Sequence, residues 1–179
     1  SLKHLIFGPS VKKITKYEFK SIGKLTKITI PETVTSIGND SFFGLSFLDE
    51  VIIPDSVTFI GDCAFNGCPI KKMSIPSSVE SIGIKAFYGC KFTEITINPM
   101  KTKMKNNSFS RISHLIFDSS ITEIHRFDLR PFDSVTKITI PESVTTIDDM
   151  AFGNLQFLRE ISIPSSVQYI ESSVFKGCL

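Results

Sequence analysis

The four cysteines are the residues whose type and spacing come closest to metal or redox chemistry. Cys68, Cys90 and Cys178 each follow a glycine in a recurring turn sequence, and Cys63 precedes an alanine. Because no two cysteines form a C-x-x-C pair, a structural zinc site is not expected. Cys68 and Cys90 fall in neighbouring copies of that turn, but side chains in register point parallel, whereas a disulfide needs converging Cβ vectors. We therefore expect small, half-buried packing residues.

The histidines and hydroxyl residues offer little for catalysis. His4 and His114 are too far apart to share a metal ion, and His125 stands near Glu123 and Asp128, which is a weak motif. We interpret these histidines as surface residues. No serine or threonine has both a base and an orienting acid in a recognisable pattern, and no glycine-rich phosphate loop is present. The sequence predicts no catalytic residue, no metal site and no cofactor.

The charge of the chain argues against a nucleic-acid partner. Twenty basic and 18 acidic residues give a net charge of +2, whereas nucleic-acid binding needs a concentrated basic face. No apolar run is long enough to span a membrane, so we expect no membrane insertion. One basic segment stands out, and it contains Lys101, Lys103 and Lys105. Two interpretations of this segment stay open: drift in a tolerant repeat, or a bulge that presents a basic ridge to a partner.

All of these residues belong to a unit that recurs along the chain, best seen in residues 48–68. It reads L-x-x-I-x-I-P-x-x-V-x-x-I-G-x-x-A-F-x-G-C. The alternating β-branched residues that end in proline predict a strand with one buried face. Val57 and Ile60 suggest a second extended or turn-like pass, and Gly61 permits a positive φ there. Phe65 then follows in a short helical turn that places its ring in the core.

The spacing of this unit predicts a repeat protein. Eight copies begin near residues 2, 25, 48, 70, 92, 112, 135 and 158. The aromatic column contains Phe19, Phe42, Phe65, Phe87, Phe109, Leu129, Phe152 and Phe175. The valine column after the proline is apolar in every copy except at Lys101. A unit this short can bury its apolar positions only against copies of itself, which is the arrangement of a solenoid.

Residues 1–179 are therefore predicted to form a single domain shaped as one curved rod. Residue 2 already begins a repeat and Leu179 stops just after one, and neither end shows the polar capping unit that solenoids need. We expect a fragment of a longer array. Because an uncapped sheet edge exposes unpaired backbone groups, we also expect possible end-to-end self-association.

The unit resembles the BspA-like, or Treponema pallidum-type, leucine-rich repeat. The match is carried by I-x-I-P-x-x-V-x-x-I-G-x-x-A-F-x-G-C at 51–68, and again from Met73 to Cys90 and from Ile161 to Cys178. The resemblance implies a right-handed superhelix with a parallel β-sheet on one face and short turns or 3-10 segments on the other. It also implies a non-catalytic, protein-binding surface antigen or adhesin at the cell surface or secreted. The alternative is a cytoplasmic leucine-rich repeat scaffold or regulatory subunit.

Two outward columns of the predicted sheet form the candidate binding surface. The charged column contains Lys27, Glu50, Lys72, Glu94, His114, Lys137 and Glu160. The second column contains Thr29, Ile52, Ser74, Thr96 and Ile116. Alternating charges in the first column are expected to be mildly favourable neighbours. A mixed stripe of this kind suits a protein ligand, although β-branched residues are also simply favoured in strands.

Overall fold

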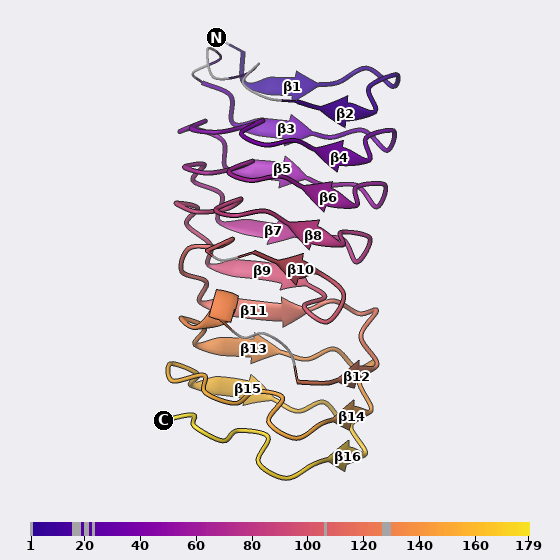
Figure 1. Cartoon of the computed structure of the whole chain (residues 1–179), viewed down its shortest axis with the longest axis vertical. Helices are drawn as coiled ribbons and strands as arrows, with labels where there is room; N and C mark the ends of the chain where they lie inside the picture. The colour runs from indigo at the N-terminus through magenta and orange to yellow at the C-terminus, as the bar shows by residue number, and fades with distance from the viewer. Residues whose placement is uncertain (1, 16–18, 20–21, 23, 106, 127–129) are drawn as a thin grey trace.

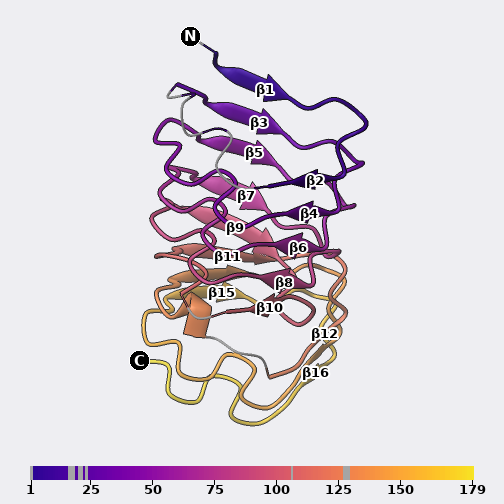
Figure 2. The same cartoon turned by 45° about the horizontal axis from the view of Figure 1, so that its top comes forward.

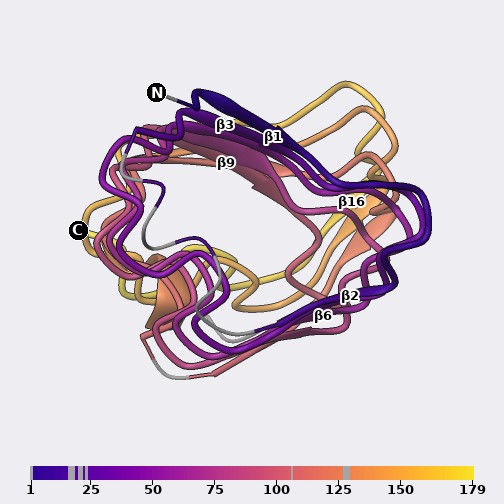
Figure 3. The same ribbon diagram turned by 90° about the horizontal axis from the view of Figure 1, so that it is seen from above.

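The computed structural model shows a parallel β-solenoid that winds around one long axis. It describes residues 2–15, 19, 22, 24–105, 107–126 and 130–179. Successive coils lie one on the next from the N-terminus to the C-terminus (Figure 1). Seen along the axis, the coils superimpose as a flattened ring (Figure 3). The predicted leucine-rich-repeat-type solenoid is thereby confirmed.

Each coil gives one strand to each of two sides, which Figure 2 shows as separate layers. The first side contains β1 (His4–Ile6), β3 (Lys27–Thr29), β5 (Glu50–Ile52), β7 (Lys72–Ser74), β9 (Glu94–Ile97), β11 (His114–Phe117), β13 (Lys137–Thr139) and β15 (Glu160–Ser162). The second side contains β2 (Lys13–Ile14), β4 (Ser36–Ile37), β6 (Phe59–Ile60), β8 (Ser81–Ile82), β10 (Lys103–Met104), β12 (Glu123–Ile124), β14 (Thr146–Ile147) and β16 (Tyr169–Ile170). The second pass of the unit thus forms its own row of two-residue parallel strands. The described residues include one 3-10 helix, η1 (Arg130–Phe132), in a connection from the second side back to the first; we call the edge formed by these connections the turn edge. No helix in the described residues is long and apolar enough to cross a bilayer.

Each side is interrupted once, at a different level of the rod. The first side consists of β1-β3-β5 and of β7-β9-β11-β13-β15. The second side consists of β2-β4-β6-β8-β10 and of β12-β14-β16. Figure 1 shows β12, β14 and β16 offset to the right of β10. Because β6 pairs with β8 and β9 pairs with β11, each gap is bridged by pairing on the opposite side.

The core is a set of columns that run along the axis. The central residue of each three-residue strand points inward, and Ile28 and Ile95 are fully buried. The aromatic column is a stack: ring centroids are 5.1 Å apart for Phe42 and Phe65, and 5.2 Å apart for Phe87 and Phe109. Burial of these rings between coils supplies the hydrophobic stabilisation that no single coil could provide.

The sixth copy fills its aromatic place with a residue that the spacing did not assign. Phe132 of η1 is fully buried, and its ring centroid lies 6.0 Å from that of Phe109. Leu129, the residue predicted for this place, lies outside the described residues. The 3-10 turn therefore delivers a phenylalanine where the repeat count pointed to leucine.

The polar break at Lys101 is resolved by a shift of one residue. Pro99 comes one place late, and the side-chain oxygen of Asn98 accepts bonds from the amides of Met100 and Lys101, both at 3.2 Å. Lys101 is exposed, and Thr102 takes the inward place at 4% exposure. The Thr102 hydroxyl donates to the carbonyl oxygen of Val79 at 2.8 Å, so the buried polar group is satisfied.

Gly61 does not use the positive φ that glycine permits. The left-handed residue lies two places later, at Cys63 with φ 54°, and Asp40 and Lys85 hold the same place in adjacent coils. A Cβ at Gly61 would lie 2.5 Å from the amide nitrogen of Asn39. Glycine is needed there because two coils approach closely, and not because of its backbone conformation.

Candidate functional site

The charged column lies along the outward face of the first side, as the spacing predicts. Parallel register sets Lys27 opposite Glu50, Lys72 opposite Glu94, and Lys137 opposite Glu160. Ion pairs join Lys27 to Glu50 and Lys137 to Glu160, and the Lys72 Nζ lies 3.2 Å from a Glu94 carboxylate oxygen. Exposed pairs of this kind contribute less than about 1 kcal/mol each.

His114 links two of these coils. Its Nδ1 lies 3.8 Å from a Glu94 carboxylate oxygen, and its Nε2 lies 2.8 Å from the Thr139 hydroxyl. Burial lowers the pKa of His114, and the nearby Glu94 carboxylate opposes that shift. The ring is therefore held mainly in its neutral form at pH 7, so it presents a hydrogen-bonding edge and adds little positive charge.

The second column lies beside the first on the same face. Register aligns Thr29 with Ile52, Ser74 with Thr96, and Thr96 with Ile116. These side chains are exposed or half-buried, and Ile52 is 48% exposed. The structure thus brings both predicted columns onto one side of the rod, where they form a mixed polar and apolar face.

One part of the charge prediction is wrong: the alternation is not continuous between coils three and four. Strands β5 and β7 are not paired, and among the described residues no ion pair joins Glu50 to Lys72. At other levels the strand-entry amides bond to the coil before, as Glu50 does to the Thr26 carbonyl at 3.1 Å and Glu94 to the Lys71 carbonyl at 3.3 Å. No described bond of this kind joins Lys72 to Asp49.

This interruption opens a shallow slot of about 350 Å³ in the middle of the face. Its lining is formed by Val51, Ile52, Ile53, Lys72, Met73, Ser74, Glu94 and Thr96. The interruption coincides with a connection that shortens by one residue, from Phe42–Val51 to Phe65–Met73. We call it the β5–β7 slot; the repeat columns alone do not reveal it, because they record spacing and not strand pairing.

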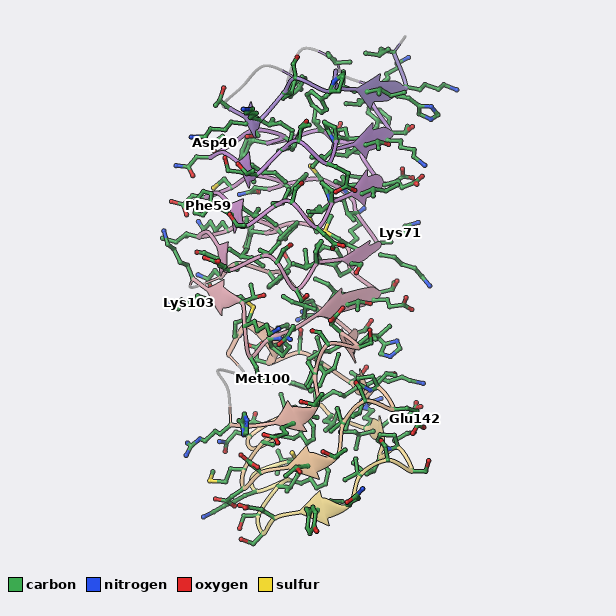
Figure 4. All side chains as sticks on the ribbon, turned by 90° about the vertical axis from the view of Figure 1, so that its right-hand side faces the viewer. Asp40, Phe59, Lys71, Met100, Lys103 and Glu142 are labelled. Carbon is green, nitrogen blue, oxygen red and sulfur yellow. The ribbon has the colours of Figure 1, made fainter. Side chains whose placement is uncertain are left out.

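The candidate basic segment lies on the opposite side of the rod. Figure 4 shows Lys103 on the same side as Phe59 and away from Lys71, which directly precedes β7. The Lys105 Nζ lies 3.6 Å from an Asp62 carboxylate oxygen, which offsets part of the local positive charge. Lys101, Lys103 and Lys105 are exposed just before the second side is interrupted, but they do not join the face of the charged column.

Three of the four cysteines make hydrogen bonds between neighbouring coils. The thiols of Cys68, Cys90 and Cys178 donate to the carbonyl oxygens of Phe42, Phe65 and Phe152, one coil earlier, at 3.2, 3.4 and 3.2 Å. All four cysteines are free thiols. Burial raises the pKa of Cys68 to about 12 and also raises the pKa of Cys90, so both stay protonated. Cys68, Cys90 and Cys178 therefore pack between coils and each donate a hydrogen bond to the preceding coil. The repeat spacing predicted the packing but not the hydrogen bonds.

His125 contacts Glu123, one of its two acidic neighbours in the sequence, and also a carboxylate that the sequence analysis did not consider. Its Nε2 lies 3.4 Å from a Glu123 carboxylate oxygen, and its Nδ1 contacts the Asp148 carboxylate one coil later. Asp128, the predicted neighbour, lies outside the described residues. The hydrogen bond to Asp148 raises the pKa of this exposed histidine. Within the described part of the chain, no group of three or more acidic, histidine or cysteine side chains is arranged to hold a metal ion.

Short parallel strands on two sides, phenylalanine stacking and a turn at every coil define a leucine-rich-repeat-type solenoid. The chain belongs to the BspA type leucine rich repeat family: it matches the BspA type leucine rich repeat region (6 copies) over residues 1–90 and 58–179. No curated protein matches the chain.

Solved structures share this architecture. A leucine-rich repeat protein from Bacteroides ovatus ATCC 8483 is 29% identical with a TM-score of 0.62, over 94% of this chain and 47% of that one. A leucine-rich repeat protein from Eubacterium ventriosum ATCC 27560 is 18% identical with a TM-score of 0.55, over 99% and 64%. A leucine rich cell surface protein from Faecalibacterium prausnitzii A2-165 is 28% identical with a TM-score of 0.45, over 89% and 47%. The chain thus spans about half to two thirds of the length of these proteins.

Proposed function

We propose that the chain is a non-catalytic protein-recognition module that binds its ligand through the outward face of the first side. The observation that carries this proposal is the pair of columns that are in register over β3–β5 and again over β7–β15, charged in one and short or branched in the other. A rigid, mixed face of this kind suits a protein ligand, because neighbouring coils repeat the same side-chain positions about every 4.8 Å.

The charged column is suited to steering and orientation. Lys72 and Glu50 keep 68% and 54% of their side-chain surface exposed although both are ion-paired. Exposed charges of both signs favour correctly oriented encounters more than they add to affinity. A ligand with a complementary pattern would therefore be selected in one register along the rod.

The β5–β7 slot is the best place for a central apolar contact. Ile52 stands exposed on its rim, and Val51 and Met73 are each 6% exposed, compared with 0% for Ile28 and Ile95 in paired strands. Interfaces gain most of their affinity from a few buried apolar anchors that charges surround. We expect an apolar side chain of the ligand to enter this slot.

A surface antigen or adhesin is the role that the family resemblance favours. Solenoids of this class present one long face to a partner, and such a face needs no cofactor or reacting group. Self-association of this chain through its end coils stays a prediction.

The proposal is tested by capturing partners with a face variant and a matched control. The face variant changes Lys27, Glu50, Lys72 and Glu94 to alanine. The control variant changes Lys13, Glu80, Lys103 and Glu123 on the second side, so that each variant removes two cations and two anions. We expect a captured protein to be lost with the face variant and retained with the control. Retention with both variants, or equal loss with both, would contradict the proposed surface.

A further inference from the structure

Two consecutive coils have unusually short connections on the turn edge. In a full-length connection the next inward residue comes six positions after the core phenylalanine, as Leu48 does after Phe42 and Leu158 does after Phe152. Only three separate Phe109 from Ile112. Phe132 and Val135 are also three apart, so the turn is trimmed at two successive levels of the rod.

The trimmed connections interrupt the hydrogen bonds that run along this edge. The Gly44 amide donates to the Asn66 carbonyl and the Gly67 amide donates to the Tyr88 carbonyl, both at 2.8 Å. At the next level the Gly89 amide bonds instead to the hydroxyl of Ser110. A side chain thus accepts the bond that a backbone carbonyl accepts at the two earlier levels, and a cavity opens beside the shortened connections.

A cavity of about 280 Å³ occupies this opening, and we call it the edge notch. It is lined by Phe92, Arg111, Ile112, Ser113, Ser134, Thr136 and Phe157. It lies at the edge of the rod where β11 and β13 begin, on the left in Figure 1, because Ser113 and Thr136 directly precede those strands. The Phe157 side chain, which lines the cavity, is 58% exposed.

The chemistry of the edge notch is apolar with one available cation. Phe92 and Ile112 are buried in its floor, and the hydroxyl of Ser134 is engaged with the Ile112 amide at 3.1 Å. Arg111 is exposed, and no ion pair or hydrogen bond of its side chain is found within the described residues. A guanidinium beside an aromatic wall is suited to a carboxylate that carries a neighbouring apolar group.

We propose that the edge notch binds an acidic peptide segment of a partner protein. An aspartate or glutamate carboxylate pairs with Arg111, and the adjacent apolar side chain packs between Phe157 and Phe92. Charge complementarity favours this occupant, because Lys91 occupies the equivalent row position one coil earlier, and the adjoining cavity that shares Arg111 is lined by Lys105 as well as by Asp133. An extended segment can enter because the notch reaches Ser113 and Thr136 at the edge of the rod, directly before β11 and β13. The site is separate from the proposed face, and each can fail without the other.

The test uses the intact chain, labelled with ¹⁵N, and two capped dipeptides as probes. Acetyl-Phe-Glu-amide carries the proposed pair of groups, and acetyl-Phe-Gln-amide differs only in charge. We expect saturable shifts of the Arg111, Ile112, Ser134 and Phe157 amides, with the acidic probe binding up to about fivefold more tightly, because an exposed ion pair contributes up to about that factor. Equal affinity for the two probes, shifts centred elsewhere or no saturation up to about 10 mM would overturn the proposal.

Matched substitutions distinguish binding at the edge notch from nonspecific binding to the protein surface. Arg111→Gln and Phe157→Ala should each weaken binding of the acidic probe about threefold to fivefold. Phe47→Ala and Lys24→Gln are the controls, because Phe47 is 53% exposed and both residues occupy the same row beside full-length turns. An unchanged amide spectrum away from the substitution shows that each variant is folded. If the two controls weaken binding as much as the two notch variants, the site is not the notch.

Discussion

The rings of Phe65 and Phe87 are stacked almost parallel, with centroids 5.2 Å apart and planes 4° apart. Both side chains are fully buried, and each ring also stacks on a further phenylalanine on its other side. Each ring therefore contacts the coil before and the coil after its own. A change in one ring affects two interfaces between coils, which is how stability is distributed in a nearest-neighbour repeat array.

Phe65→Ala should lower the free energy of unfolding by about 3 to 5 kcal/mol, because the substitution leaves a cavity between two coils. Glu50→Ala is the control: its side chain is more than half exposed, and its loss should cost less than about 1 kcal/mol. Denaturant unfolding followed by circular dichroism measures both values. If both variants lose the same stability, the assignment of inward and outward positions is wrong.

Cys68 and Cys90 should resist alkylation in the folded protein at pH 8. Burial raises the pKa of both thiols, so the reactive thiolate is scarce at that pH. Cys63 and Cys178 are half-buried and should react first. Iodoacetamide labelling read by peptide mass spectrometry measures the order, and full labelling in denaturant supplies the control. Modification of Cys68 as fast as Cys63 in the folded state would refute the buried assignment.

The columns of the repeat were enough to predict which residues point outward. A fixed interval between copies places Lys72 beside Glu94 and Thr29 beside Ile52, because parallel strands in register align equivalent residues. The same reasoning could have paired His125 with Asp148, since register sets Glu123 opposite Thr146 two residues earlier. That contact was missed because only neighbours in the sequence were considered.

Features that depend on local chain path could not be predicted in this way. The separation of Glu50 from Lys72 follows from the lack of pairing between β5 and β7, which no column records. Phe132, three residues after the predicted Leu129, reaches the core as the last residue of the 3-10 helix η1. Thr102 turns inward because the preceding proline is displaced by one residue. In each case a change of one to three residues in a connection alters geometry while the repeat count hardly changes.

His125 should make stability fall as the pH rises above about 6.5. Its hydrogen bond to Asp148 raises its pKa in the folded state, so the stabilisation is complete below the unfolded value and is lost as the pH passes through the folded value. The side chain is exposed, and the effect should be below about 1 kcal/mol. Unfolding midpoints of wild type and His125→Gln between pH 5.5 and roughly 8.5 measure it. A difference that does not change with pH would contradict the prediction.

His114 should change stability with pH in the opposite direction to His125. Burial lowers its pKa, so its neutral form is favoured in the folded state and stability is lost as the pH falls below about 6.5. Ring-proton titration by NMR should therefore place the midpoint of His114 below that of His125. The reverse order would show that the Glu94 carboxylate outweighs burial at His114.

Gly61→Ala should destabilise the protein by about 2 kcal/mol or more, because overpacking against backbone cannot relax easily. The new Cβ would lie 2.5 Å from the amide nitrogen of Asn39 and 2.6 Å from the carbonyl carbon of Gly38, so two coils would have to separate. Gly8→Ala is the matched control: nothing lies within 4 Å of its added Cβ and its φ is not left-handed. That change should be neutral or stabilising by up to about 1 kcal/mol, because it restricts the unfolded chain. Thermal unfolding compares the two, and equal midpoints would show that the coils do not meet closely at Gly61.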